Sequence, residues 1–355
     1  MFGVFRFVLA ICVVIAHIAK PSYGLSIIGG FAVYGFFILS GYLMTLVMNK
    51  RYGFDAEGIK KFLLNRFLRI YPTYWLSILI SIILLMNYGQ HDLQHFNDKI
   101  KYPDSLYDIL SNTFIFGLAR TGLFELHDTI LSPPAWALEI ELIFYIAIGL
   151  GLGKRKFAIP WLIVTFVTIF LARIGFFILG KITNQTYGFS YGSLIYASLA
   201  FVAGSLIFHY QETIIYYIDL LKRRFHLRTS ISLLLLAIMF FANAFLSGTA
   251  TRALAFPLNT IFMILAIILL LGAESSKHKN LVTIDKIFGG ISYPVYLLHY
   301  QIAFLVSKYL PGVQDKGWSL FLWSLPLIIL VSLFIHLAFE KPIENIRNLV
   351  RKSTS

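Results

Sequence analysis

Charged residues are scarce in this sequence: Asp, Glu, Lys and Arg make up 13% of its 355 residues. Soluble domains carry about 25%, so a soluble fold of this length would lack the polar groups to cover its surface. Hydrophobic residues make up 58% of the chain, and the mean hydropathy is +0.76. The apolar side chains must therefore face lipid, which predicts a polytopic integral membrane protein.

Cysteine is nearly absent, because Cys12 is the only one in the chain. A single cysteine excludes an internal disulfide framework and any metal site built from several cysteines, and we expect no bound metal. The formal net charge of +13 would fit a nucleic-acid-binding protein. The basic residues gather between long hydrophobic segments, however, which is typical of membrane proteins. We therefore expect no nucleic-acid partner.

A helix that crosses the hydrocarbon core of a bilayer needs about 20 predominantly apolar residues. Ten segments meet this requirement, which predicts an all-α bundle of about ten transmembrane helices. The segments are 4–20, 25–48, 70–88, 136–153, 157–179, 192–210, 229–247, 252–272, 287–306 and 319–339.

The distribution of Lys and Arg between these segments predicts the orientation. If the N-terminus is cytoplasmic, the inside loops hold 20 of the 30 basic residues and the outside segments hold 8. Loops rich in Lys and Arg stay in the cytoplasm, so we expect both termini there. The basic excess then serves topology and contact with anionic lipid headgroups, and the expected location is a bacterial plasma membrane.

The first hydrophobic segment holds two ionisable side chains, Arg6 and His17, which are 11 residues apart. On an α-helix this spacing is three turns plus roughly 20° and about 16 Å along the axis, so both share one face. Ionisable groups inside a span are costly and usually mark function, which makes His17 a candidate catalytic residue. Two structural explanations stay open: Arg6 could extend to lipid headgroups, and His17 could satisfy a polar helix interface.

A second candidate is the pair Arg66 and Arg69, which precedes the third segment. The i,i+3 spacing projects both side chains together on the first turn of that helix, at the cytoplasmic face. Two guanidinium groups suit a phosphorylated ligand from the cytosol. The alternative is ordinary anchoring of a membrane helix by positive charge.

Two further groups of polar residues stand out. Glu139 and Glu141 are two residues apart and point to opposite sides of a helix, which leaves Glu141 as the candidate for a buried role. Near the other end of the chain, a run of hydroxyl, phenol and imidazole groups lies on one helical segment, although such aromatic stripes are more often packing than binding sites. Its members are Ser292, Tyr293, Tyr296 and His299.

In chain order, these features resemble the membrane acyltransferase-3 family, the bacterial O-acyltransferases that modify cell-surface glycans. The resemblance covers nearly the whole chain. Tyr34 departs from it where the family often has an aspartate, and Ala137 where it often has a serine; neither removes a group assigned to chemistry. The similar segments are 6–17 (Arg-x10-His), 35–43 (Phe-Phe-x-x-Ser-Gly-Phe-Leu), 66–72 (Arg-x-x-Arg), 136–145 (Trp-Ser-Leu-x-x-Glu-x-x-Phe-Tyr), and the closing patterns 291–299 and 339–342.

The resemblance implies a multi-pass O-acyltransferase of the bacterial inner membrane that acts in polysaccharide biosynthesis. The donor would be cytosolic acyl-CoA, with acetyl-CoA as the default. The acceptor would be a hydroxyl of a cell-surface or lipid-linked glycan. Residues 1–345 would form one transmembrane acyltransferase domain, and residues 346–355 a basic cytoplasmic tail.

The resemblance also implies roles for the candidate residues. The acyl-CoA phosphates would lie on Arg66 and Arg69, together with Arg6. His17 would act as general base or as nucleophile, and Glu141 would orient it. The acceptor would contact the group formed by Ser292, Tyr293, Tyr296 and His299.

A transporter or flippase for a glycan or glycolipid is the alternative function. Buried charge and broken helices near the middle of the membrane would suit it, and the same residues would serve. Acyl transfer by the purified protein separates the two possibilities.

Overall fold

The computed structural model describes residues 2–20, 25–119, 129–183, 193–225, 228–247, 252–273, 279–313 and 315–352. Within these residues the structure is helical and has no strands. Ten helices are long and apolar enough to cross a membrane, which confirms the predicted all-α fold with about ten spans. The helices are α1 (Phe2–Val14), α2 (Ile28–Val47), α3 (Ala56–Tyr88), α4 (Gln90–Phe96), α5 (Leu106–Phe114), α6 (Ala135–Ala147), α7 (Arg155–Thr183), α8 (Leu194–Phe225), α9 (Thr229–Leu246), α10 (Arg252–Ala273), α11 (Lys279–Tyr309), α12 (Trp318–Ile335) and α13 (Lys341–Lys352).

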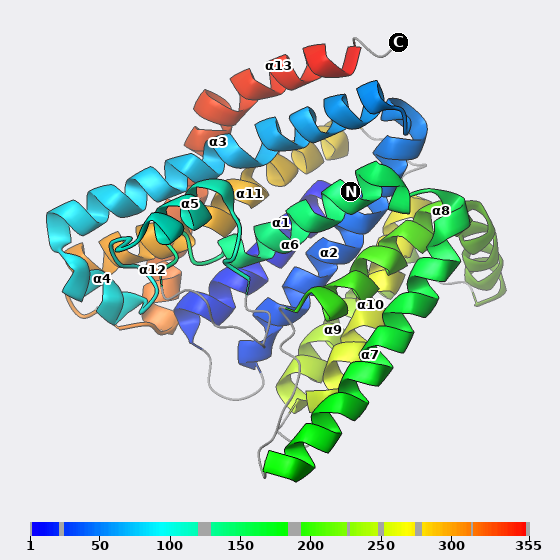
Figure 1. Cartoon of the computed structure of the whole chain (residues 1–355), viewed down its shortest axis with the longest axis horizontal. Helices are drawn as coiled ribbons and strands as arrows, with labels where there is room; N and C mark the ends of the chain where they lie inside the picture. Colours follow the sequence, from blue (N-terminus) through cyan, green and yellow to red (C-terminus); the bar gives the residue numbers. More distant parts are fainter. Residues whose placement is uncertain are drawn as a thin grey trace.

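Helices α1 and α2 form the centre of the bundle. Helix α1 packs against α2 and α11, and α2 packs against α8 (Figure 1). In its most apolar stretch α2 is 72% buried, whereas α7 is 6% buried, so α2 lies in the core and α7 presents its side chains to lipid. The α2–α8 contact is close because Gly41 has no side chain: a Cβ there would collide with the backbone at Phe201. Small residues permit such close helix packing in membranes.

Helix α3 is longer than its hydrophobic segment. It begins at Ala56, whereas the apolar run predicted a start near residue 70. The additional turns carry charged side chains, which lower the hydropathy but do not prevent helix formation. Arg66 and Arg69 therefore lie inside α3, and their expected position on its first turn is wrong.

Helix α13 follows α12 after a π-helical turn, His336–Glu340. In Figure 1 it lies alongside the first half of α3, and the two helices are in contact. Most of the segment expected to be a basic tail thus belongs to this helix, because α13 continues to Lys352.

Candidate active site

Two histidines from opposite ends of the chain meet in the bundle. His17 lies in a π-helical turn, Ile15–Ala19, that continues α1, and His299 lies on α11. The Nδ1 atom of His17 is 2.9 Å from Nε2 of His299, and the two rings stack at 5.1 Å. His299 is fully buried, whereas His17 remains partly exposed. His17 is therefore the member of the pair that a substrate can reach.

A backbone carbonyl fixes the protons on this pair. Nδ1 of His299 lies 2.8 Å from the carbonyl oxygen of Tyr296. Because a carbonyl can only accept, this Nδ1 carries the proton, and Nε2 of a neutral His299 is then an acceptor. His17 must donate to it from Nδ1. The lone pair of a neutral His17 therefore resides on its Nε2, which has no partner among the described residues.

Lys316 lies near the histidine pair, against an aromatic ring that also contacts His17. The ring of Tyr300 stacks on His17 at 5.1 Å, and Nζ of Lys316 lies 5.1 Å from the centre of that ring and 4.9 Å from that of Phe96. Burial, with a smaller contribution from Lys20, lowers the pKa of Lys316 to about 8. The sequence predicts no role for Lys316, because this lysine belongs to no motif and stands among the basic residues outside the spans.

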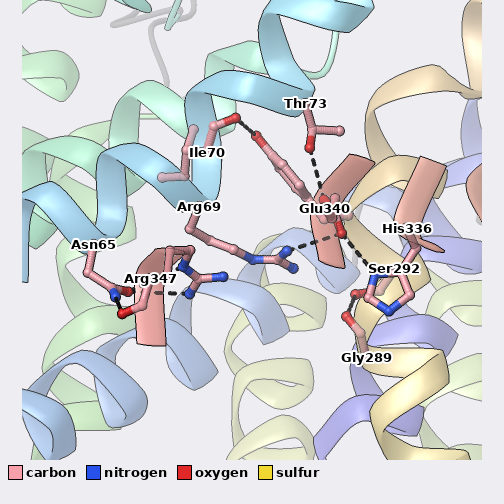
Figure 2. Close-up of polar contacts among 10 residues, drawn as sticks. Asn65, Arg69, Ile70, Thr73, Gly289, Ser292, His336, Glu340 and Arg347 are labelled. Carbon is pink, nitrogen blue, oxygen red and sulfur yellow. Dashed lines mark hydrogen bonds and ion pairs between the residues drawn. The ribbon is translucent and has the colours of Figure 1, made fainter. Parts of the chain in front are cut away.

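The second polar cluster lies at the other end of α1 and is centred on Glu340. Its carboxylate accepts hydrogen bonds from Arg69 at 3.2 Å and from Thr73 at 2.9 Å, and His336 lies 3.1 Å away (Figure 2). Glu340 is 6% exposed. In the sequence Glu340 belongs to a closing pattern, but its partner on α3 could not be predicted, because 271 residues of chain lie between Arg69 and Glu340.

Arg66 extends this cluster along α3, and Arg6 of α1 faces the same region. Nη2 of Arg66 donates to Asn65 Oδ1 at 2.8 Å, but its buried Nε has no partner among the described residues. Arg6 interacts electrostatically with Arg69, Glu141 and Glu340. The three arginines expected to bind a donor therefore gather in one place, which we call the arginine end of the site.

Glu141 belongs to the arginine end and does not contact His17. It accepts hydrogen bonds from Ser40 at 2.8 Å and from Tyr145 at 2.9 Å. The expectation that Glu141 orients His17 is not met, because His299 occupies that position. Glu139 points elsewhere and binds the backbone amides of Gly117 and Ala119.

The hydroxyl groups expected to bind the acceptor donate hydrogen bonds to backbone carbonyls inside the bundle. Tyr293 donates to the carbonyl of Ile70 at 2.8 Å, and Tyr296 to that of Pro134 at 2.9 Å. Ser292 donates within α11 to Gly289 at 2.9 Å. The Tyr293 ring also lies 5.3 Å from the guanidinium carbon of Arg69. In this structure these side chains position α3, α6 and α11 around the two clusters.

The structure thus holds an accessible imidazole and a group of arginines in a bundle of membrane-spanning helices, the arrangement of a membrane-embedded enzyme or transporter. Among the described residues, no three His, Cys, Asp or Glu side chains are grouped to hold a metal ion. A sequence model of one family, described as an acyltransferase domain, matches residues 2–337. The chain belongs to this acyltransferase 3 family and is a membrane acyltransferase. No curated protein and no solved structure matches the chain.

Proposed function

We propose that this acyltransferase moves an acyl group, with acetyl as the first candidate, from cytosolic acyl-CoA to a hydroxyl of a cell-surface or lipid-linked glycan. Its setting would be a bacterial inner membrane. The observation that carries the proposal is the His17–His299 hydrogen bond of 2.9 Å, which leaves the reactive lone pair of His17 on Nε2, a nitrogen with no partner among the described residues.

The arginine end supports acyl-CoA as the donor. Arg6, Arg66 and Arg69 bring three positive charges to a place where the carboxylates are the half-buried Glu141 and the buried Glu340. Guanidinium groups bind phosphate through paired, charge-assisted hydrogen bonds. Arg6 and His17 are about 16 Å apart along α1 by helix geometry, a length comparable to the pantetheine arm of CoA. A donor held by its phosphates at the arginine end would thus present its thioester to His17.

His17 would act as the general base. Its Nε2 removes the proton of the acceptor hydroxyl while the hydroxyl oxygen attacks the thioester carbonyl. The C–S bond then breaks, and the imidazolium returns the proton to the leaving thiolate. The products are the O-acylated glycan and free CoA. His299 keeps the Nδ1 proton of His17 in place, so that the same nitrogen accepts and returns the proton.

Lys316 would assist at the carbonyl oxygen. Negative charge develops on this oxygen during attack, and a positive charge in a desolvated site stabilises it. The Lys316 ammonium interacts electrostatically with His17 and with Asp98, and among the described residues it forms no ion pair. It is therefore available to the developing oxyanion.

Reconstituted protein tests the proposal. Purified protein in lipid nanodiscs is given acetyl-CoA and the lipid-linked glycan fraction of a strain that lacks the gene. Free CoA is then followed with a thiol reagent, and the glycan is analysed by mass spectrometry. We expect CoA release coupled to an increase of one acetyl group on the glycan. Translocation of the glycan without acetylation would instead support the transporter function.

A further inference from the structure

Helix α13 lies beyond the part of the chain that matches the acyltransferase family, which ends at residue 337. One of its arginines, Arg347, turns toward α3 and is only 8% exposed. It meets Asn65, which is completely buried. The side-chain amide of Asn65 donates to the carbonyl of Arg347 at 3.1 Å (Figure 2). This contact brings a fourth guanidinium group to the arginine end.

Asn65 serves two arginines with one neutral oxygen. Its Oδ1 lies 2.8 Å from Nη2 of Arg66 and 3.3 Å from Nη2 of Arg347. Neither arginine forms an ion pair with a carboxylate among the described residues, since Glu340 is taken by Arg69. The arginine end thus holds four guanidinium groups, those of Arg6, Arg66, Arg69 and Arg347, and two carboxylates, those of Glu141 and Glu340. An excess of two positive charges remains.

An excess of positive charge in a buried place indicates a binding site for an anion. A charge removed from water is costly unless a counter-charge compensates it, and the shared amide oxygen supplies none. The buried Nε of Arg66 also lacks a partner among the described residues. A dianionic phosphate supplies the missing charge and several acceptor oxygens, two of which a planar guanidinium group can bind through parallel hydrogen bonds.

We infer that Arg347 of α13 completes the donor site and, with Arg66, binds the 3′-phosphate of acyl-CoA. The inference rests on the proposed use of acyl-CoA. Asn65 and Arg66 lie about two turns of α3 before Thr73, which bonds Glu340. The thioester points the other way, toward His17, so the nucleotide end of the donor falls at Arg347. Helix α13 is then part of the donor site rather than a tail.

Three donors test this assignment on the purified full-length protein: acetyl-CoA, acetyl-3′-dephospho-CoA and S-acetylpantetheine. We expect the wild type to have its lowest KM for acetyl-CoA. Arg347→Ala should raise that KM about tenfold or more, since charge-assisted contacts to phosphate have this strength. The KM for the other two donors and the kcat should change little. Arg347→Lys should restore part of the discrimination.

Asn65→Asp separates phosphate binding from simple anchoring of α13. The new carboxylate would pair with both arginines and strengthen an anchor, so a purely structural Arg347 predicts an unchanged advantage of acetyl-CoA over its dephospho form and an equal or higher melting temperature. If Arg66 and Arg347 bind phosphate, the carboxylate competes with it and repels it. The KM for acetyl-CoA should then rise and its advantage over the dephospho donor should disappear. This variant is informative even if Arg347→Ala does not fold.

Lys341→Ala is the matched control. Lys341 lies on the same helix and is exposed, so this variant removes one positive charge without affecting Asn65, and all KM values should stay unchanged. Equal discrimination between acetyl-CoA and its dephospho form in wild type and Arg347→Ala would overturn the inference and leave the proposed function intact. A wild type that cleaves none of the three donors would instead refute the proposed use of acyl-CoA.

Discussion

His17 and His299 are joined by a hydrogen bond of 2.9 Å between Nδ1 and Nε2, although 282 residues separate them in the chain. The carbonyl of Tyr296 lies 2.8 Å from Nδ1 of His299 and therefore determines which nitrogens of the two histidines carry protons. Nδ1 of His299 donates to the carbonyl, Nε2 of His299 accepts from Nδ1 of His17, and Nε2 of His17 keeps the free lone pair. A neutral histidine takes the place of the carboxylate that orients the base in a serine protease.

The role of His299 predicts different outcomes for two substitutions. His299→Gln keeps an oxygen that can accept from Nδ1 of His17, and it should retain partial activity. His299→Leu removes the acceptor and leaves the His17 tautomer unfixed. We expect its kcat to fall on the order of 10²-fold or more, because a misoriented tautomer costs up to about 10⁴-fold in serine proteases. Equal kcat values for the two variants would show that His299 only fills space.

Glu340 should matter for both stability and donor binding. In Glu340→Gln, Thr73 keeps an acceptor, but the charge that holds Arg69 is lost. Breaking a buried ion pair by removing one partner costs about 3–5 kcal/mol, and the partial exposure of Arg69 places the expected cost at the lower end. The melting temperature in detergent should fall, and the KM for acetyl-CoA should rise. Glu212→Gln, at an exposed position of α8, is the control and should change neither the melting temperature nor the KM.

Lys316 predicts a specific pH dependence. Its pKa is lowered to about 8, so the ammonium is charged below that pH and neutral above it. If this charge stabilises the oxyanion, kcat should decline as the pH rises through about 8. Lys316→Arg stays charged because the arginine pKa exceeds 12, and its profile should remain flat past pH 8. Lys316→Met should be slow throughout. A wild-type decline that persists in Lys316→Arg would assign it to another group.

The same lysine has an effect on stability with a defined sign. Its pKa is about 8 in the folded protein and 10.5 in a model compound. Between these values the unfolded chain binds more protons than the folded one, so stability should increase as the pH rises through this window. Lys316→Met should lack this increase in a thermal unfolding series.

The orientation of the bundle can be checked by labelling. Cys12 is buried, so Cys12→Ala provides a background without cysteine. New cysteines are then introduced at Lys60 and Asp104, which are both exposed. A membrane-impermeant maleimide added to intact cells should label the residue-104 variant and spare the residue-60 variant. Labelling of residue 60 from outside would reverse the topology and place the arginine end away from the cytosol.

The sequence predicted the spans well because hydropathy is summed over about 20 residues and tolerates single errors. It predicted the helix ends poorly, as at α3, where charged residues such as Lys60, Lys61 and Arg66 lower the hydropathy of about four turns of helix that precede the apolar run. The arginines and His17 were accessible to sequence reasoning because ionisable groups stand out in apolar segments. The roles of His299, Glu340 and Lys316 could not be predicted from the sequence, because each role depends on contacts between segments that are distant in the chain.

His17 is the residue on which the proposed chemistry depends most directly. General base catalysis contributes typically 10²–10⁴-fold. His17→Ala should therefore abolish detectable acylation while the protein inserts and accumulates normally. His17→Gln should not restore it, because an amide cannot accept and return a proton. Cys12→Ala, from the same helix, is the control and should retain nearly full activity. A well-expressed His17→Ala protein that acylates glycan at the wild-type rate would exclude His17 from the reaction. The donor bound at the arginine end would then react with the help of a different base.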